Sequence, residues 1–95
     1  MSQVLDPSLA EQAQKALEQH AWQEAFDLAS RADAAGQLTP EELELLAQAA
    51  WWVGKLPLAI EARERAYSAH VKSGNEAMAA IAAILIGRDN LLRNA

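Results

Sequence analysis

The sequence of 95 residues contains no cysteine and has little glycine, proline or aromatic side chain. The absence of cysteine excludes disulfide bonds and thiolate metal sites, and it agrees with a reducing cytoplasm. Valine, threonine and aromatic residues, which favour strands, are scarce, whereas alanine, leucine, glutamate and glutamine are abundant. This composition predicts an all-α protein.

Basic charge is also scarce. The chain has 8 lysine and arginine residues against 13 aspartate and glutamate residues, which gives a formal net charge of −5. The basic residues are scattered, and no run of them forms a basic patch. We therefore expect no direct nucleic-acid binding and no association with an anionic membrane surface.

Long hydrophobic runs are absent. The most apolar stretch, AMAAIAAILIG at residues 77–87, is shorter than the ~20 residues that a membrane-spanning helix needs. The first residues, MSQVLDPSLAEQ, lack the basic-then-apolar order of a signal peptide. We expect a cytoplasmic protein whose residues 1–95 form a single domain, because the chain is too short for two independent cores.

Two places in the sequence are typical of helix N-termini. Asp6 is a candidate N-cap before Pro7. Thr39 is a stronger candidate, because Pro40 fits the first helical position and Glu42 is spaced to complete a capping box.

Glycines mark the ends of the helical segments. Gly36 and Gly74 are placed to end helices in a left-handed turn, and Gly54 separates two further apolar segments. Between these marks the apolar residues recur with helical spacing. The pattern predicts five helices, at residues 7–20, 22–35, 40–53, 57–73 and 75–93.

A shift of 34 residues aligns the chain with itself. The less common coincidences pair Leu9 with Leu43, Gln14 with Gln48, and Arg31 with Arg65. His20 and Gly54 coincide at a turn. This is the period of a helix–turn–helix repeat whose neighbours stack and cover one another's apolar faces. We predict repeat one at 7–36, repeat two at 40–73 and a half repeat at 75–93.

The second repeat resembles the tetratricopeptide (TPR) repeat. The matching residues are Leu43, Leu46, Ala47, Ala50 and Trp51 in the first helix, then Gly54, Leu56, Ala59, Ile60, Ala66 and Tyr67 in the turn and second helix. Two departures are Pro57 in the turn and Arg63 at a position that is usually aromatic. The resemblance implies a right-handed stack of antiparallel helix pairs, here about two and a half repeats.

A longer segment, AAWWVGKLPLAIEARERAYSAHVKSGNEAMAAIAAIL at 49–85, is similar to the repeat region of bacterial transcriptional regulators of the LuxR and MalT type. In those regulators the repeats bind partners or transmit a signal, and a separate helix-turn-helix segment reads DNA. The present sequence contains no such segment. The resemblance implies a protein–protein interaction module that is part of, or partner to, a bacterial regulator.

The TPR geometry gives the adjacent tryptophans different expected places. The first helix of each repeat lines a concave groove, so Trp51 is expected to pack against the third repeat and Trp52 to face the groove. Tryptophan and methionine suit a peptide-binding surface because they offer large and adaptable contact area. The alternative is that both rings serve only packing between repeats. The implied partner-binding residues are Glu44, Gln48, Trp52, Met78, Ala82 and Ile86.

The fifth expected helix is apolar on nearly every side from residue 77 to residue 86. Such a helix is normally covered on both faces, and stacked repeats usually end in a polar capping helix. Three outcomes stay open, namely a symmetric dimer, a docking face for another protein, and a further helix beyond residue 95. We favour a homodimer through Ile81, Ile84 and Leu85. A structural homo-oligomerisation element with an empty groove is therefore the alternative function.

Few residues suggest catalysis or metal binding. His20 is expected in a turn, and His70 is expected on the surface of the fourth helix. Glu61 and Arg65 have the spacing of an exposed i, i+4 ion pair. The sequence contains no His-x₃-His pair and no Glu-x₂-His pair, and no glycine-rich phosphate loop is present. We expect no metal, no cofactor and no enzymatic activity.

Overall fold

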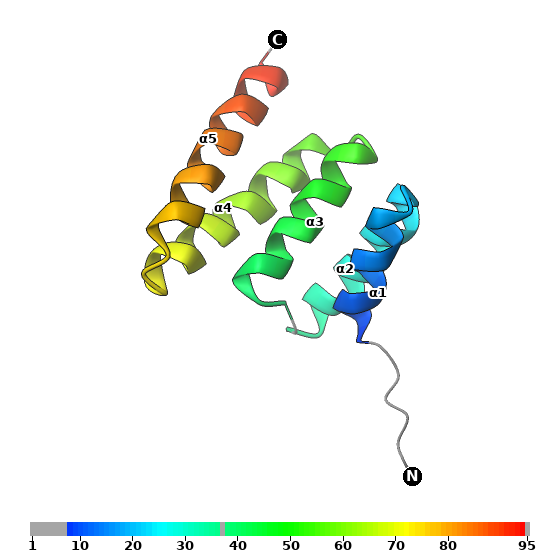
Figure 1. Ribbon diagram of the computed structural model, residues 1–95. Coiled ribbons are helices and arrows are strands. Elements are labelled where there is room, and N and C mark those ends of the chain that lie inside the picture. Colours follow the sequence, from blue (N-terminus) through cyan, green and yellow to red (C-terminus); the bar gives the residue numbers. More distant parts are fainter. Residues whose placement is uncertain (1–7, 37, 95) are drawn as a thin grey trace.

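The computed structural model of the protein describes residues 8–36 and 38–94. These residues form five α-helices and no strand, so the all-α prediction is confirmed. The bounds of the last four helices agree with the predicted ones to within one residue at each end. The helices are α1 (Leu9–Glu18), α2 (Trp22–Ala34), α3 (Pro40–Trp52), α4 (Leu56–Lys72) and α5 (Glu76–Arg93) (Figure 1).

Both ends of α1 differ from the prediction of residues 7–20, since the helix begins at Leu9 and ends at Glu18. Ser8 is the N-cap, and its hydroxyl oxygen accepts a hydrogen bond of 3.0 Å from the backbone N–H of Glu11. The Glu11 carboxylate accepts in return from the backbone N–H of Ser8 at 2.8 Å, and these hydrogen bonds lower the pKa of Glu11. This capping box begins the helix at Leu9 rather than at residue 7. The predicted cap at Asp6 lies, with Pro7, outside the described residues.

The predicted capping box of α3 is confirmed. The hydroxyl of Thr39 accepts from the backbone N–H of Glu42 at 3.2 Å, and the Glu42 carboxylate accepts from the N–H of Thr39 at 3.0 Å. Pro40 occupies the first helical position, where its missing N–H removes no hydrogen bond. The local sequence is therefore sufficient to fix where α3 begins.

The glycines at the predicted helix ends adopt the left-handed backbone conformation, with φ of 69° at Gly36, 81° at Gly54 and 78° at Gly74. His20 also adopts it, with φ of 61°, at the turn position that Gly54 occupies 34 residues later. A side chain at such a position costs about 1 kcal/mol relative to glycine. The same backbone hydrogen bond closes three of these turns, from Ala21 to Ala16, from Lys55 to Ala50 and from Asn75 to His70.

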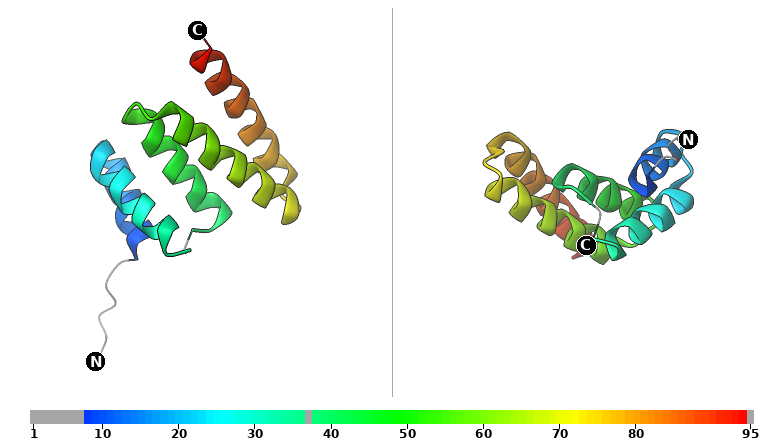
Figure 2. Two further views of the ribbon diagram at one scale, coloured as in Figure 1. Left: turned by 180° about the vertical axis from the view of Figure 1, so that it is seen from behind. Right: turned by 90° about the horizontal axis from the view of Figure 1, so that it is seen from below.

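The helices form a curved row in which each packs against the next one in the sequence (Figure 2). In addition, α1 packs against α3, and the contact between α3 and α4 is the most extensive. Among the described helices, the backbone of α5 comes close to that of α4 alone. One side of α5 and the space beside α3 are therefore left uncovered by the described residues.

Small side chains make these close helix contacts possible. Alanines with at most 1 % of their surface exposed recur in α1 to α5, for example at positions 13, 32, 47, 66 and 82. An apolar cluster joins α1, α2 and α3, with Ala62 of α4, around Leu17, Leu28 and Leu46. No helix among the described residues has both the length and the apolar character needed to cross a membrane.

Ion pairing between helices differs from the prediction for Arg65. Its guanidinium nitrogens Nη2 and Nη1 lie 2.7 and 2.9 Å from the two carboxylate oxygens of Asp33 in α2. Arg65 is thus paired with Asp33 rather than, as expected, with Glu61, although the Glu61 charge contributes to raising the pKa of Arg65. A bidentate carboxylate on a neighbouring helix offers two well-aligned bonds, which a carboxylate one turn away does not.

Candidate functional site

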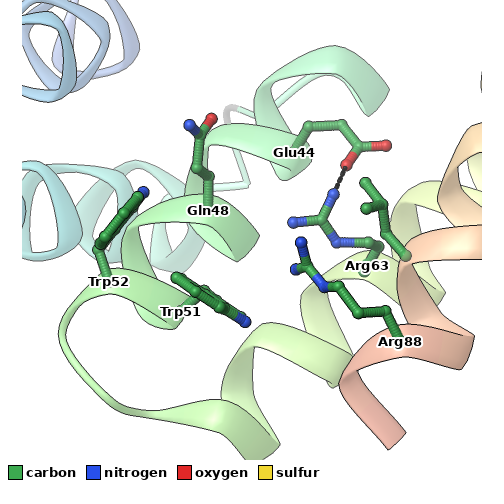
Figure 3. A pocket seen from close by; sticks show the side chains of 7 residues that line it. Glu44, Gln48, Trp51, Trp52, Arg63 and Arg88 are labelled. Carbon is green, nitrogen blue, oxygen red and sulfur yellow. Dashed lines mark hydrogen bonds and ion pairs between the residues drawn. The ribbon is translucent and has the colours of Figure 1, made fainter. Parts of the chain in front are cut away.

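A groove with a volume of about 400 Å³ lies beside α3, between its side chains and those of α4 and α5 (Figure 3). This volume falls within the range of small-ligand and side-chain pockets. The groove is defined here by its lining residues, which are Glu44, Gln48, Trp51 and Trp52 of α3, Arg63 of α4, and Leu85 and Arg88 of α5.

Helical spacing explains why α3 supplies most of the lining. Glu44, Gln48 and Trp51 or Trp52 follow one another at intervals of three or four residues, so they share one side of the helix. The opposite side of α3 carries Leu43 and Leu46, which are buried in contact with the neighbouring helices. The same helix therefore contributes an apolar side to the core and a mixed polar and aromatic side to the groove.

The floor of the groove contains a shielded ion pair. Nη1 of Arg63 donates a hydrogen bond of 2.8 Å to Oε1 of Glu44, and these side chains are only 7 % and 18 % exposed (Figure 3). Burial lowers the pKa of Arg63, while the negative charges of Glu44 and Asp89 oppose that effect. Arg63 stands where the TPR resemblance expects an aromatic ring, and here it holds α4 to α3 by charge.

His70 completes this cluster below the groove. Its side chain is 0 % exposed, and its Nε2 lies 3.4 Å from Oε2 of Glu44. The expectation that His70 is a surface residue is wrong, because the last turn of α4 faces α3 at this point. Neither ring nitrogen of His70, nor Oε2 of Glu44, has a hydrogen-bond partner among the described residues. The cluster is therefore held by charge and burial more than by a complete hydrogen-bond network.

A second ion pair forms the α5 side of the groove. Nε of Arg88 donates a hydrogen bond of 2.8 Å to Oδ1 of Asp89, and Nη2 of Arg88 lies 2.7 Å from the same oxygen. Asp89 is 0 % exposed, whereas the side chain of Arg88 is 44 % exposed and faces the groove. Two arginines and two carboxylates thus lie around the groove, and their formal charges cancel.

The tryptophans belong to a row of stacked groups that crosses the molecule. Trp52 stacks on Trp22 of α2, with ring centroids 4.7 Å apart and planes 10° apart, and His20 stacks on Trp22 at 4.9 Å. Trp51 meets Trp52 edge to face at 5.0 Å, and the guanidinium of Arg88 lies 5.1 Å from the centre of the Trp51 ring. Such stacked and cation–π contacts each contribute about 0.5–1.5 kcal/mol.

This row explains how two adjacent tryptophans serve different purposes. Trp51 is partly buried and points toward Arg88, in agreement with the expectation that it packs against the last helix (Figure 3). Trp52 lies at the other end of the groove and is 47 % exposed. Stacking on Trp22 fixes the orientation of the Trp52 ring while leaving about half of it open to solvent.

The structure brings together only some of the residues expected to bind a partner. Glu44, Gln48 and Trp52 line the groove, but Met78, Ala82 and Ile86 do not. Ala82 is 0 % exposed because it packs toward α4, so a partner cannot reach it. Met78 and Ile86 are partly buried.

The α5 residues of the groove are shifted around the helix from those expected. Leu85, which was expected in the self-association surface, lines the groove, and Arg88 joins it. Ile81 and Ile84 are exposed, at 48 % and 71 %, as that surface would require. Arg63 was not predicted to line the groove. The signal in the sequence was that an arginine stands where the TPR resemblance expects an aromatic residue.

Comparison of the sequence with protein-family models and with curated proteins gives no match, and comparison with solved structures gives none either. The groove itself is therefore the feature that indicates a function. The described residues include no group of three or more histidine, cysteine, aspartate or glutamate side chains that could hold a metal ion. What the groove offers is an exposed aromatic ring, an apolar wall, and amide and guanidinium donors.

Proposed function

We propose that the protein is a protein–protein interaction module whose groove binds a peptide or a helix of a partner protein. The exposed face of Trp52 beside the groove is the observation that carries this proposal. Covering the exposed half of an indole removes roughly 100 Å² of apolar surface from water, which stabilises a complex by roughly 2–3 kcal/mol. Exposed tryptophans beside a concave surface are typical anchors of protein interfaces.

The fixed orientation of Trp52 supports this role. The ring is held between Trp22 and Trp51 before any partner arrives, so little side-chain freedom is lost on binding. Binding to a preformed surface is tighter than binding to a mobile one for the same contact area. The stack with Trp22 therefore supports recognition as well as stability.

The polar groups of the groove suit the backbone of a peptide. Gln48 is exposed and offers both an amide donor and a carbonyl acceptor. Arg88 keeps donors beyond those bonded to Asp89, and the apolar wall is Leu85. We expect a partner segment with one large apolar side chain against Trp52 and Leu85, and with backbone carbonyl groups toward Gln48 and Arg88.

We further propose that the helices are a TPR-like right-handed stack of two and a half repeats, used within or alongside a bacterial regulator in the cytoplasm. The sequential helix contacts and the shared left-handed turn at His20 and Gly54 support the repeat assignment. The resemblance of the sequence to the repeats of LuxR- and MalT-type regulators supports the regulatory context.

Selection from a random peptide library followed by affinity measurement tests the proposed groove. Peptides selected on the wild-type protein should bind Trp52→Ala at least tenfold more weakly, because the lost contact corresponds to more than about 1.4 kcal/mol. Leu58→Ala is the matched control, since Leu58 is 45 % exposed but lies outside the groove. Its affinity for the peptides should equal that of the wild type.

Circular dichroism and thermal unfolding of both variants show whether the fold is retained, because Trp52→Ala also removes the stack on Trp22. The variant Gln48→Ala provides a second test of the groove, since Gln48 is exposed and contributes little to the fold. If selected peptides bind Trp52→Ala and Gln48→Ala as tightly as the wild type, the groove is not the binding site. A selection that enriches no peptide favours the alternative, a structural homo-oligomerisation element with an empty groove.

A further inference from the structure

A second uncovered surface lies on α5, on the side turned away from α4. Ala80, Ile84, Gly87 and Leu91 follow one another at intervals of four, three and four residues, so they form one stripe along the helix. All four are exposed, and Ile84 and Leu91 are 71 % and 77 % exposed. We call this stripe the outer face of α5. It is separate from the groove, to which α5 contributes Leu85 and Arg88.

Gly87 is the feature of the outer face that the chain itself does not explain. It lies inside α5 and, unlike the three other glycines, it is not among the residues with positive φ. A Cβ atom at Gly87 would meet no described atom within 4 Å, so no neighbour within the chain requires a glycine here. Glycine inside a helix costs about 1 kcal/mol relative to alanine. A glycine is explained if another backbone approaches the helix closely at this point.

The outer face is complementary to itself when it is reversed. In an antiparallel pair of α5 helices, Ile84 of one chain lies opposite Gly87 of the other, and Leu91 lies opposite Ala80. Each large side chain then meets a small one, and the two-fold axis passes between the levels of Ile84 and Gly87. A symmetric dimer requires a surface that is complementary to itself in this way, whereas binding of a helix from another protein does not require it. Alternating steps of three and four residues are also the pattern of a two-helix seam.

We infer that the outer face of α5 binds the outer face of a second copy of this chain in antiparallel orientation. The ends of the helix support that orientation, since its first turn carries the acidic Glu76 and its last turn the basic Arg93. Antiparallel pairing brings opposite charges and opposite helix-dipole ends together, whereas parallel pairing brings like charges together. The seam itself contains no charged residue.

The adjoining surface of α4 enlarges this contact. A depression of about 400 Å³ lies beside the outer face. Its lining residues are Tyr67 and Val71 of α4, Gly74 of the turn, and Glu76, Ala79, Ala80 and Ala83 of α5. Tyr67 and Val71 are 40 % and 53 % exposed. One α5 helix, about 27 Å long at 1.5 Å per residue, is a narrow contact by itself. The surface of α4 adds area to this contact, and a stable interface buries roughly 1,200 Å² or more.

Sedimentation velocity over a concentration series tests the dimer. The wild-type chain of 10.3 kDa should approach twice that mass as its concentration rises. Ile84→Glu should weaken association by more than about 100-fold, because it places an unpaired charge at the centre of the seam. Leu58→Glu is the matched control on another surface and should associate as the wild type does. A wild-type chain that stays at 10.3 kDa at the highest concentrations overturns the inference.

Gly87→Leu tests the close approach without disturbing the monomer. Open space lies beyond Gly87 in the chain, so the leucine fits and the thermal midpoint of the monomer should hold or rise. The dimer should be lost, because the leucine occupies the space needed by Ile84 of the second copy. Unchanged association of Gly87→Leu would contradict the proposed seam even if the wild type is dimeric.

Disulfide cross-linking tests the orientation of the two helices. Only the introduced cysteines can react, because the sequence contains no native cysteine. A mixture of Ala80→Cys and Leu91→Cys should form a cross-linked heterodimer, since antiparallel pairing puts these positions opposite each other. Either variant alone should cross-link poorly, because its own two copies lie about 16 Å apart along the seam, beyond the reach of a disulfide. Efficient cross-linking of each variant with itself, and none in the mixture, would show a parallel pair and overturn the inference.

Discussion

The contact of α2 with α3 and the contact of α4 with α3 are stabilised by different kinds of buried side chain. Between α1, α2 and α3 the cluster is apolar, with Leu17, Leu28 and Leu46 set among small residues. Between α3, α4 and α5 the buried side chains include Arg63, His70 and Asp89. The first half of the molecule is held by exclusion of apolar surface from water, and the second half depends also on charges that compensate one another.

This difference explains why the groove lies where it does. The side chains of an apolar cluster pack together without leaving a groove, because the burial of each one stabilises the fold. A charged cluster remains partly open, because Glu44 and Arg88 keep favourable contact with solvent. The charged side chains of α3, α4 and α5 therefore create a surface with polar donors beside exposed aromatic rings. Breaking each half in turn should separate these contributions.

The largest expected effect is the loss of the shielded ion pair. Arg63→Met should lower the free energy of unfolding by about 3 kcal/mol, because it leaves Glu44 shielded without its partner. Chemical denaturation at pH 7 measures this loss. The double variant Glu44→Leu with Arg63→Met should recover most of it, since an apolar pair replaces the charges without leaving either unpaired. A double variant less stable than Arg63→Met would show that the Glu44–Arg63 pair adds to the free energy of unfolding beyond offsetting its own burial cost.

A smaller loss is expected from truncation in the apolar half. Leu46→Ala should lower the free energy of unfolding by about 2–3 kcal/mol, because it removes buried methyl groups and leaves a cavity. Denaturation of this variant at two salt concentrations provides the comparison with Arg63→Met. The effect of Leu46→Ala should not depend on salt, and a strong salt dependence would mean that the two halves are not distinct in the way described.

The smallest expected effect concerns the exposed pair of Arg65 with Asp33. Hydrogen bonds from Arg65 hold the pKa of Asp33 below its ordinary value, so the pair stabilises the fold above that ordinary value. The contribution is lost as pH falls through the lower pKa of the folded state. Asp33→Asn should therefore lower the free energy of unfolding by about 0.5–1 kcal/mol at pH 7 and change it little near pH 2. Equal effects at both pH values would contradict this account of Asp33.

Local signals predicted the helices well. The capping box at Thr39 and the left-handed glycines at 36, 54 and 74 depend only on residues within one turn, so the sequence contains all that is needed. The start of α1 was misplaced because two overlapping N-terminal signals, at Asp6 and Ser8, lie close together. Helical spacing also placed Glu44, Gln48 and Trp52 on one side of α3, where they line the groove.

The partners of the polar and aromatic residues could not be predicted from spacing. Glu44 and Arg63 are 19 residues apart, and Trp22 and Trp52 come from different helix pairs. A periodic pattern gives the face on which a residue lies, but not which polar group of another helix will face it. His70 shows this most clearly, because an ionisable side chain near a helix end is usually exposed and here it is fully buried.

The proposed function places a partner segment in the groove of α3, against Trp52. The most direct measurement is a titration of the isotope-labelled protein with a selected peptide, followed by the backbone and indole N–H resonances. We predict that the largest shifts occur at Trp52, Gln48 and Leu85, with little change at Leu58 and the rest of the opposite surface. Shifts confined to Leu58 or to the outer face of α5, with the Trp52 indole unchanged, would contradict the account.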